Sequence, residues 1–330
     1  MHPKYHDVLD PAYLAYALDV ERNSAGPTGD LALLRQQYQE TSHRQRPGDY
    51  ADLHIDDSTV TSRDGRPIAV RAYAAHQKAS QSLTMYVHGG GWVLGNLDSH
   101  DDICADICRQ TESTVLAIDY RLAPEHPFPA ALHDCIDVLN ALTVSTSDRL
   151  AKLQPDSLVL AGDSAGANLV TAACLSGAWP ASDVFKGLVL FYPGLSANDA
   201  LPAFQEHREA PLLPQPFLDF FVHAYLHGGT IEPTVLTSPL LATDLSAIPA
   251  CHIAAAEHDP LRDDAIVFTE KLQAQGIACS LDVLASLGHG FLRVRRSSEP
   301  ARTAFEDACK AMMALHTGQF STTYGSGGAP

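Results

Sequence analysis

The sequence predicts an α/β protein with an eight-stranded, mostly parallel sheet that carries helices on both faces. Short apolar runs alternate with helical patterns from about residue 83 onward, as expected for strand–helix–strand units that build a parallel sheet. Two earlier strand patterns flank Asp64-Gly65, a pair typical of a hairpin turn. The length of 330 residues suits one large α/β domain.

The elements follow from the changing period of apolar residues. Two amphipathic helices are expected around residues 13–18 and 31–38, because their apolar side chains recur at helical spacing. From residue 51 the pattern alternates, which predicts strands over 51–60 and 67–73. Buried strands are then expected at 83–87, 114–118, 158–160, 188–191, 253–256 and 279–284, and helices at about 99–111, 129–142, 165–178, 261–275 and 300–315.

One interval, about 195–235, breaks this alternation. It contains many prolines and an apolar, aromatic cluster but no clear strand, and a long insertion of this kind is usually functional. We expect it to pack with the N-terminal helices as a cap. The predicted organisation is a helical cap segment over 1–48, a core over 49–316 with the cap insertion at about 195–235, and a flexible tail over 317–330.

The amino-acid composition restricts the kinds of molecule that the protein is expected to bind. The formal net charge of −17 disfavours nucleic acid and anionic membranes, and the sequence shows no signal peptide and no apolar run that could span a bilayer. A cytoplasmic protein acting on a small molecule is expected, as a monomer or a homo-oligomer. The seven cysteines predict no disulfide framework, and Cys104 and Cys108 are interpreted as reduced thiols rather than metal ligands. No metal and no cofactor are expected.

A nucleophilic serine is the first chemical candidate. An apolar strand runs into Gly162-Asp163-Ser164-Ala165-Gly166, and a helical pattern follows. Gly-x-Ser-x-Gly in this context is the nucleophile elbow, a sharp turn that exposes the serine hydroxyl at the carboxyl end of a strand. The turn also places the Ala165 amide at a helix N-terminus, where it can meet developing negative charge.

A second glycine motif, His88-Gly89-Gly90-Gly91-Trp92, follows the strand expected at 83–87. Consecutive glycines let backbone amides face a substrate oxygen, so Gly89, Gly90, Gly91 and Ala165 are the candidate oxyanion donors. Which of the three glycines donate is left open. A dinucleotide phosphate loop is the rival interpretation, but Gly-x-Gly-x-x-Gly is not satisfied here. His88 is expected to hydrogen-bond the loop in place.

The base and its acidic partner follow from chain order. Enzymes with such an elbow carry serine, then Asp or Glu, then histidine. His289 lies in the glycine-flanked turn Leu287-Gly288-His289-Gly290-Phe291 after the last expected strand, and Asp259 is the first Asp beyond the strand before it. Glu257 is the alternative acid. Asp263 and Asp264 are interpreted as the acidic first turn of the next helix.

These motifs resemble the hormone-sensitive-lipase-like branch of the α/β hydrolases, known as bacterial esterase family IV. The resemblance extends over about residues 80–310 and rests on the two glycine motifs, Asp259-Pro260-Leu261, Gly288-His289-Gly290-Phe291 and the segment Asp119–Ala130. It implies the α/β-hydrolase fold with an N-terminal cap, a catalytic triad of Ser164, Asp259 and His289, and short-chain acyl esters as substrates.

Substrate identity is less constrained by the sequence. Trp92, Phe217 and Phe221 are expected to line a confined apolar pocket, together with Phe220 and Tyr225, although such aromatics serve equally well as core. Acyl groups of a few carbons are expected. Amidase, formamidase and lactonase activities remain open alternatives because the same triad serves each, and a non-catalytic ligand receptor is the rival from another class. Residues 119–130 are expected to act as a scaffold.

Overall fold

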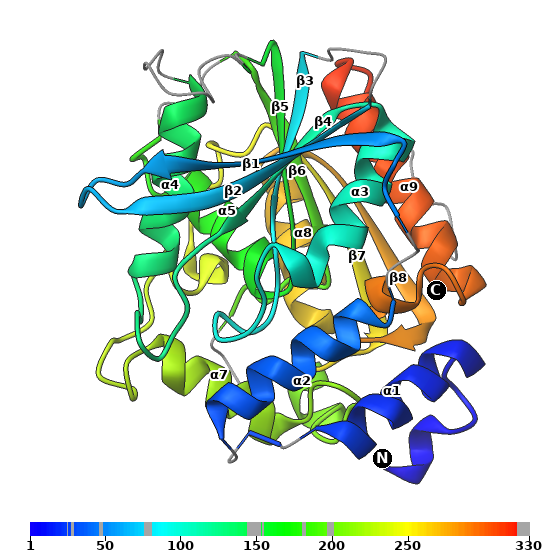
Figure 1. The fold of residues 1–330 in the computed structure, drawn as a ribbon. Coiled ribbons are helices and arrows are strands. Elements are labelled where there is room, and N and C mark those ends of the chain that lie inside the picture. Colours follow the sequence, from blue (N-terminus) through cyan, green and yellow to red (C-terminus); the bar gives the residue numbers. More distant parts are fainter. Residues whose placement is uncertain are drawn as a thin grey trace.

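An eight-stranded sheet in the order β1-β2-β4-β3-β5-β6-β7-β8 runs through the computed structural model (Figure 1). The structure describes residues 1–24, 26–27, 30–45, 49–75, 81–143, 153, 155–179, 183–196 and 201–321. β2 pairs antiparallel with β1 and β4, and every other neighbouring pair is parallel. The strands are β1 Leu53–Thr61, β2 Pro67–Ala75, β3 Ser82–Val87, β4 Thr114–Asp119, β5 Ser157–Asp163, β6 Phe185–Phe191, β7 Ala250–His258 and β8 Ala278–Gly288.

Helices cover both faces of this sheet. Apolar residues of α3 and α9 pack with one face, and those of α4, α5 and α8 pack with the other. The α-helices are α1 Pro11–Asn23, α2 Leu31–His43, α3 Asp101–Thr111, α4 Ala130–Thr143, α5 Ala165–Leu175, α6 Pro202–Glu206, α7 Gln215–Tyr225, α8 Arg262–Ala274 and α9 Glu299–His316. The predicted α/β architecture is confirmed, including the eight strands and the antiparallel hairpin at their start.

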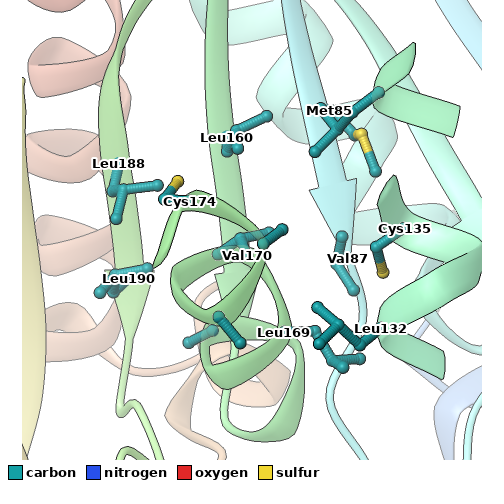
Figure 2. Close-up of a cluster of buried hydrophobic side chains, with 14 of the residues drawn as sticks. Met85, Val87, Leu132, Cys135, Leu160, Leu169, Val170, Cys174, Leu188 and Leu190 are labelled. Carbon is teal, nitrogen blue, oxygen red and sulfur yellow. The ribbon is translucent and has the colours of Figure 1, made fainter. Parts of the chain in front are cut away.

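The core explains why the central strands are apolar throughout. In β5, Leu158 and Leu160 face the α4 and α5 side, whereas Val159 and Ala161 face the α3 and α9 side. Figure 2 shows the first of these layers, in which side chains of α4 and α5 lie against β3, β5 and β6. A strand that is buried on both faces cannot show the alternation of a half-exposed strand, because every side chain leaves water.

The helices α1, α2 and α7 lie on the side of the sheet where the parallel strands have their carboxyl ends (Figure 1). The interval 201–235 contains α6 and α7 and no strand, as its sequence indicated. Residues 46–48, at the predicted end of the cap segment, 197–200 within the insertion and 322–330 of the predicted tail lie outside the described residues. The division into cap, core and tail stays a prediction.

Two smaller expectations concern the cysteines and membranes. All seven cysteines are free and buried, and the thiol of Cys108 lies 3.4 Å from the carbonyl oxygen of Tyr73. Burial raises the pKa of Cys108 to about 11, so this thiol stays protonated at neutral pH. Within the described ranges, none of the helices combines the length and apolar character that crossing a bilayer requires.

Candidate active site

Ser164 lies at the sharp turn between β5 and α5. Its φ of 52° and ψ of −117° place a non-glycine residue in a rarely populated region, the kind of strain that functional sites retain. The turn requires small neighbours. A Cβ on Gly162 would lie 2.7 Å from the Gly166 carbonyl carbon, and one on Gly166 would lie 2.6 Å from the His88 carbonyl oxygen. The two glycines therefore let β5 and α5 approach each other and the chain after β3.

Three side chains from distant parts of the chain converge at this turn. His289 Nε2 lies 3.0 Å from Ser164 Oγ, and His289 Nδ1 lies 2.8 Å from Asp259 Oδ2. Ser164 and His289 are each 9% exposed and Asp259 is 1% exposed, so the array is shielded from bulk water. Because the imidazole contacts a hydroxyl on one side and a carboxylate on the other, it can accept a proton from the first while the second stabilises its charge.

The histidine loop is held from outside the core. The Tyr13 hydroxyl of α1 donates to the backbone carbonyl of His289 at 2.8 Å. A Cβ at Gly288 would lie 2.6 Å from the same hydroxyl, so the absence of a side chain there admits the tyrosine. The carboxylate of the alternative acid, Glu257, binds Arg262 at 2.7 Å with its side chain 40% exposed, whereas Asp259 contacts His289 Nδ1.

The glycine loop after β3 lies beside Ser164, but not all of its backbone amides are free to bind a substrate oxyanion. The Gly89 amide donates to the buried Asp163 carboxylate at 2.8 Å. This corrects the expectation that Gly89 is a candidate oxyanion donor, because its single N–H already has a partner. Among the residues that the structure describes, none accepts a hydrogen bond from the amides of Gly90, Gly91 or Ala165. These three amides remain the candidates.

Comparison with known proteins places this arrangement in a family. A family model described as the alpha/beta hydrolase fold matches residues 84–293. The chain belongs to the α/β-hydrolase family. A carboxylesterase of Mycobacterium tuberculosis, NlhH, is 35% identical to this hydrolase over 249 residues, which cover 73% of this chain and 76% of the relative.

Two further relatives extend over more of the hydrolase. An ethyl acetate hydrolase of Pseudomonas putida is 31% identical over 306 residues, covering 89% of this chain and 95% of the relative. The structure of an esterase from Pyrobaculum calidifontis superimposes with a TM-score of 0.80 at 26% identity, covering 93% of this chain and 99% of that one. These matches confirm the resemblance to the hormone-sensitive-lipase-like esterases. The chain is a serine hydrolase of the carboxylic ester hydrolase class.

Asp163, between the elbow glycine and the serine, ties the two glycine motifs of the hydrolase together. Besides the Gly89 amide, its carboxylate accepts a hydrogen bond of 2.7 Å from the Tyr86 hydroxyl. Burial raises the pKa of Asp163, but the adjacent His100 ring, the Tyr86 hydroxyl and the charge of Arg293 together lower it well below its ordinary value. A permanently ionised acceptor therefore fixes the start of the glycine loop relative to Ser164.

The segment 119–130 supports the same loop. The Tyr120 hydroxyl donates to the carbonyl of His88 at 2.8 Å, and the Ala123 amide donates to the carbonyl of Trp92 at 2.9 Å. The His88 ring stacks on Tyr120 at 4.3 Å and its Nδ1 lies 2.8 Å from the Gly89 carbonyl oxygen. Burial, aided by the nearby His100, lowers the pKa of His88 to about 3, so this ring is neutral.

An ion pair joins the segment to the helix above the site. Arg35 of α2 binds Glu125 through both terminal guanidinium nitrogens at 2.7 and 2.8 Å. The same guanidinium donates to the carbonyls of Val93 and Ala123. The scaffold role expected for residues 119–130 is consistent with these contacts, and sequence patterning contained no signal that paired Glu125 with Arg35.

A cavity of about 820 Å³ opens from the triad toward α1, α2 and α7. Trp92, Phe217 and Phe221 line it, as expected for pocket residues. Phe220 and Tyr225 are not among its lining residues. Tyr225 instead is buried and stacks on Trp92 at 4.3 Å with nearly parallel rings. Some aromatic side chains of α7 therefore line the pocket, whereas Tyr225 packs in the core.

Asp263 and Asp264 do more than begin α8. Asp264 accepts hydrogen bonds from the amides of Leu195 and Ser196 at 2.7 and 2.9 Å, and Asp263 accepts one from the Ala203 amide at 2.8 Å. Both lie in the first helical turn, as predicted, but their carboxylates also fix the start of the insertion. Burial raises the pKa of Asp264 to about 6 despite these donors.

Proposed function

We propose that this hydrolase cleaves short-chain acyl esters through an acyl-enzyme formed on Ser164. The observation that carries the proposal is the convergence of Ser164, His289 and Asp259 within hydrogen-bond distance in one buried array. Each group is of the type its role requires: a hydroxyl as nucleophile, an imidazole as base, and a carboxylate that fixes the imidazole tautomer.

In the first half-reaction, Ser164 Oγ attacks the ester carbonyl while His289 Nε2 takes its proton. Asp259 accepts the Nδ1–H hydrogen bond and stabilises the imidazolium. The negative charge that develops on the carbonyl oxygen is met by the amides of Ala165 and of Gly90 or Gly91, since Gly89 donates to Asp163. His289 then protonates the leaving alcohol, and the acyl group stays on Ser164.

Water repeats the sequence in the second half-reaction. His289 removes a proton from the water, the hydroxide attacks the acyl carbonyl, and the proton returns to Ser164 Oγ as the carboxylic acid leaves. No redox step and no other co-reactant is needed to balance this chemistry. A preference for small acyl groups is part of the proposal, although the cavity volume lies in the upper part of the 300–1,000 Å³ range typical of small-molecule sites.

The test is hydrolysis of p-nitrophenyl acetate by the wild type and by Ser164→Ala. The variant is expected to lose roughly 10⁴- to 10⁶-fold in kcat because the covalent route disappears. Unchanged circular dichroism and melting temperature would show that the fold survives. An organophosphate should label the wild type once, at Ser164. Turnover retained by the alanine variant, or labelling at another residue, would refute the assignment.

A further inference from the structure

Two tyrosines and an arginine form one polar part of the wall of the active-site cavity. Tyr16 of α1, Tyr38 of α2 and Arg293 all line the cavity, and we call these three side chains the donor corner. Arg293 belongs to a short 3-10 helix, Phe291–Val294, that directly follows the His289 loop. The corner therefore lies where the N-terminal helices meet the segment that carries the catalytic base.

Contacts within the donor corner fix the direction of its hydrogen bonds. Arg293 Nη2 donates to the Tyr38 hydroxyl oxygen at 3.1 Å, and the guanidinium lies 5.5 Å from the centre of the Tyr38 ring. Because that oxygen is an acceptor toward Arg293, the proton of the same hydroxyl is free to point elsewhere. In the part of the chain that the structure describes, no residue accepts a hydrogen bond from the hydroxyl of Tyr38 or Tyr16.

The three groups act as donors at any physiological pH. Burial raises the pKa of both Tyr16 and Tyr38, and the positive charge of Arg293 lowers each only in part, so the phenols keep their protons. A guanidinium has no acceptor atom. A ligand that fills this end of the cavity without an acceptor atom would leave buried donors unpaired, which is costly.

The charge around Arg293 indicates which acceptor fits. Asp102 lies 3.9 Å from Arg293, although Arg295 binds it more closely at 2.7 Å, and the Asp163 carboxylate lies 3.6 Å from the His100 ring, which contacts Arg293. Arg293 Nη2 donates to His100 Nε2 at 2.8 Å. Since the negative charges of Asp102 and Asp163 already stabilise the guanidinium, a further anion would gain little here. An uncharged oxygen accepts the free phenol protons without adding charge.

We propose that the donor corner is a subsite for an uncharged hydrogen-bond acceptor, a carbonyl or ether oxygen in the acyl or alcohol part of the substrate other than the ester group that reacts. The preferred substrates are then oxygenated esters rather than simple alkyl esters. This inference deepens the proposed function and rests on Ser164 as the nucleophile. Tyr16 and Tyr38 determine specificity and take no part in bond cleavage.

The experiment compares substrates that differ only in one oxygen. The first series consists of p-nitrophenyl oxoalkanoates, which carry a ketone at successive positions of the acyl part. The second consists of acetates of the corresponding keto-alcohols, which carry the ketone in the alcohol part. Each ester is compared with its plain analogue of equal chain length. For the wild type, kcat/KM is expected to favour the oxo member at one or more positions. Tyr38→Phe and Tyr16→Phe should each reduce the ratio of kcat/KM for the oxo ester to kcat/KM for its plain analogue about 2- to 12-fold, the range of one neutral hydrogen bond.

Controls separate this inference from the proposed function. Tyr225→Phe makes the same chemical change at a buried hydroxyl that has no partner among the described residues and does not line the cavity, so it should leave the preference intact. Calorimetric binding of the same ester pairs to Ser164→Ala measures the oxygen preference without turnover. If the wild type failed to hydrolyse the plain esters while this binding preference persisted, the proposed function would be refuted. The assignment of the donor corner as an acceptor-binding subsite would still be supported.

Three results would overturn the donor corner. The first is equal kcat/KM and equal binding for oxo and plain esters at every position in both series. The second is a preference that survives unchanged in the Tyr16→Phe/Tyr38→Phe double variant. The third is a stronger preference for hemi-esters with a free carboxylate at the same position, which would make the subsite anionic rather than uncharged.

Discussion

Gly91 offers a direct test of the proposed oxyanion donors, because its environment leaves no room for a side chain. Its φ is +61°, and a Cβ built there would lie 2.5 and 2.6 Å from the Cδ2 and Cδ1 atoms of the Phe221 ring. Ordinary carbon contacts begin near 3.4 Å. In Gly91→Ala, either the ring or the loop must therefore move by about 1 Å, and the left-handed backbone adds roughly 1 kcal/mol of strain.

The expected consequence is a loss of rate rather than of binding. A shift of about 1 Å at a catalytic group can cost about 100-fold, and removal of one oxyanion donor costs about 10²- to 10³-fold in kcat. Gly91→Ala should therefore lower kcat on p-nitrophenyl acetate by about 100-fold with little change in KM. Steady-state kinetics on protein with native circular dichroism makes the measurement.

A second variant identifies the cause. Phe221→Ala removes the ring that the new Cβ would meet, so the double variant Gly91→Ala/Phe221→Ala should recover much of the lost kcat, beyond what independent effects allow. Full activity in the single variant would refute the tight contact. A double variant whose losses simply multiply would show that displacement by the ring is not the mechanism.

Three other predictions address the acid, the insertion and the core. Asp259→Asn should lower kcat by about 10⁴-fold through the wrong imidazole tautomer, whereas Glu257→Gln, at a half-buried ion pair that does not contact His289, should leave ester kinetics nearly unchanged. Asp264 has a folded-state pKa of about 6, above its unfolded value, so its contribution to stability is present at pH 4 and is lost as the pH rises through 6. Asp264→Asn, which mimics the protonated acid, should therefore raise the melting temperature relative to wild type at pH 8 but not at pH 4, and an equal shift at both would contradict the pKa. Leu160→Ala should destabilise the protein by about 2–5 kcal/mol in urea unfolding, because Leu160 is fully buried between β5 and the α4 and α5 layer, and a loss below 1 kcal/mol would contradict this packing.

The sequence predicted the sheet and the candidate triad because both depend on local patterns and on chain order. Every strand run of the core was apolar enough to recognise, and His289 and Asp259 each follow a strand that ends at the same edge. The carboxyl ends of neighbouring parallel strands must meet, so side chains just beyond them can be placed without coordinates. The distances of 2.8 and 3.0 Å agree with that placement.

Interactions between distant side chains could not be predicted in the same way. Nothing in three consecutive glycines distinguishes Gly89, whose amide binds Asp163, from the two that follow. Helical spacing also could not separate Phe221, which lines the cavity, from Tyr225 one turn later, which stacks on Trp92. The contact between Arg293 and Tyr38 was not predicted, because it joins side chains 255 positions apart in the sequence and such a contact has no local signature.

The hydrogen bond from Tyr13 to the carbonyl of His289 links helix α1, which also lines the cavity, to the candidate base. Replacing residues 1–24 by the equivalent stretch of a relative would then alter two properties at once. The opening would change shape, and the imidazole would lose an anchor unless the incoming helix also supplied a hydroxyl at position 13. Substrate range and turnover in this hydrolase are therefore not independently adjustable from its N-terminus.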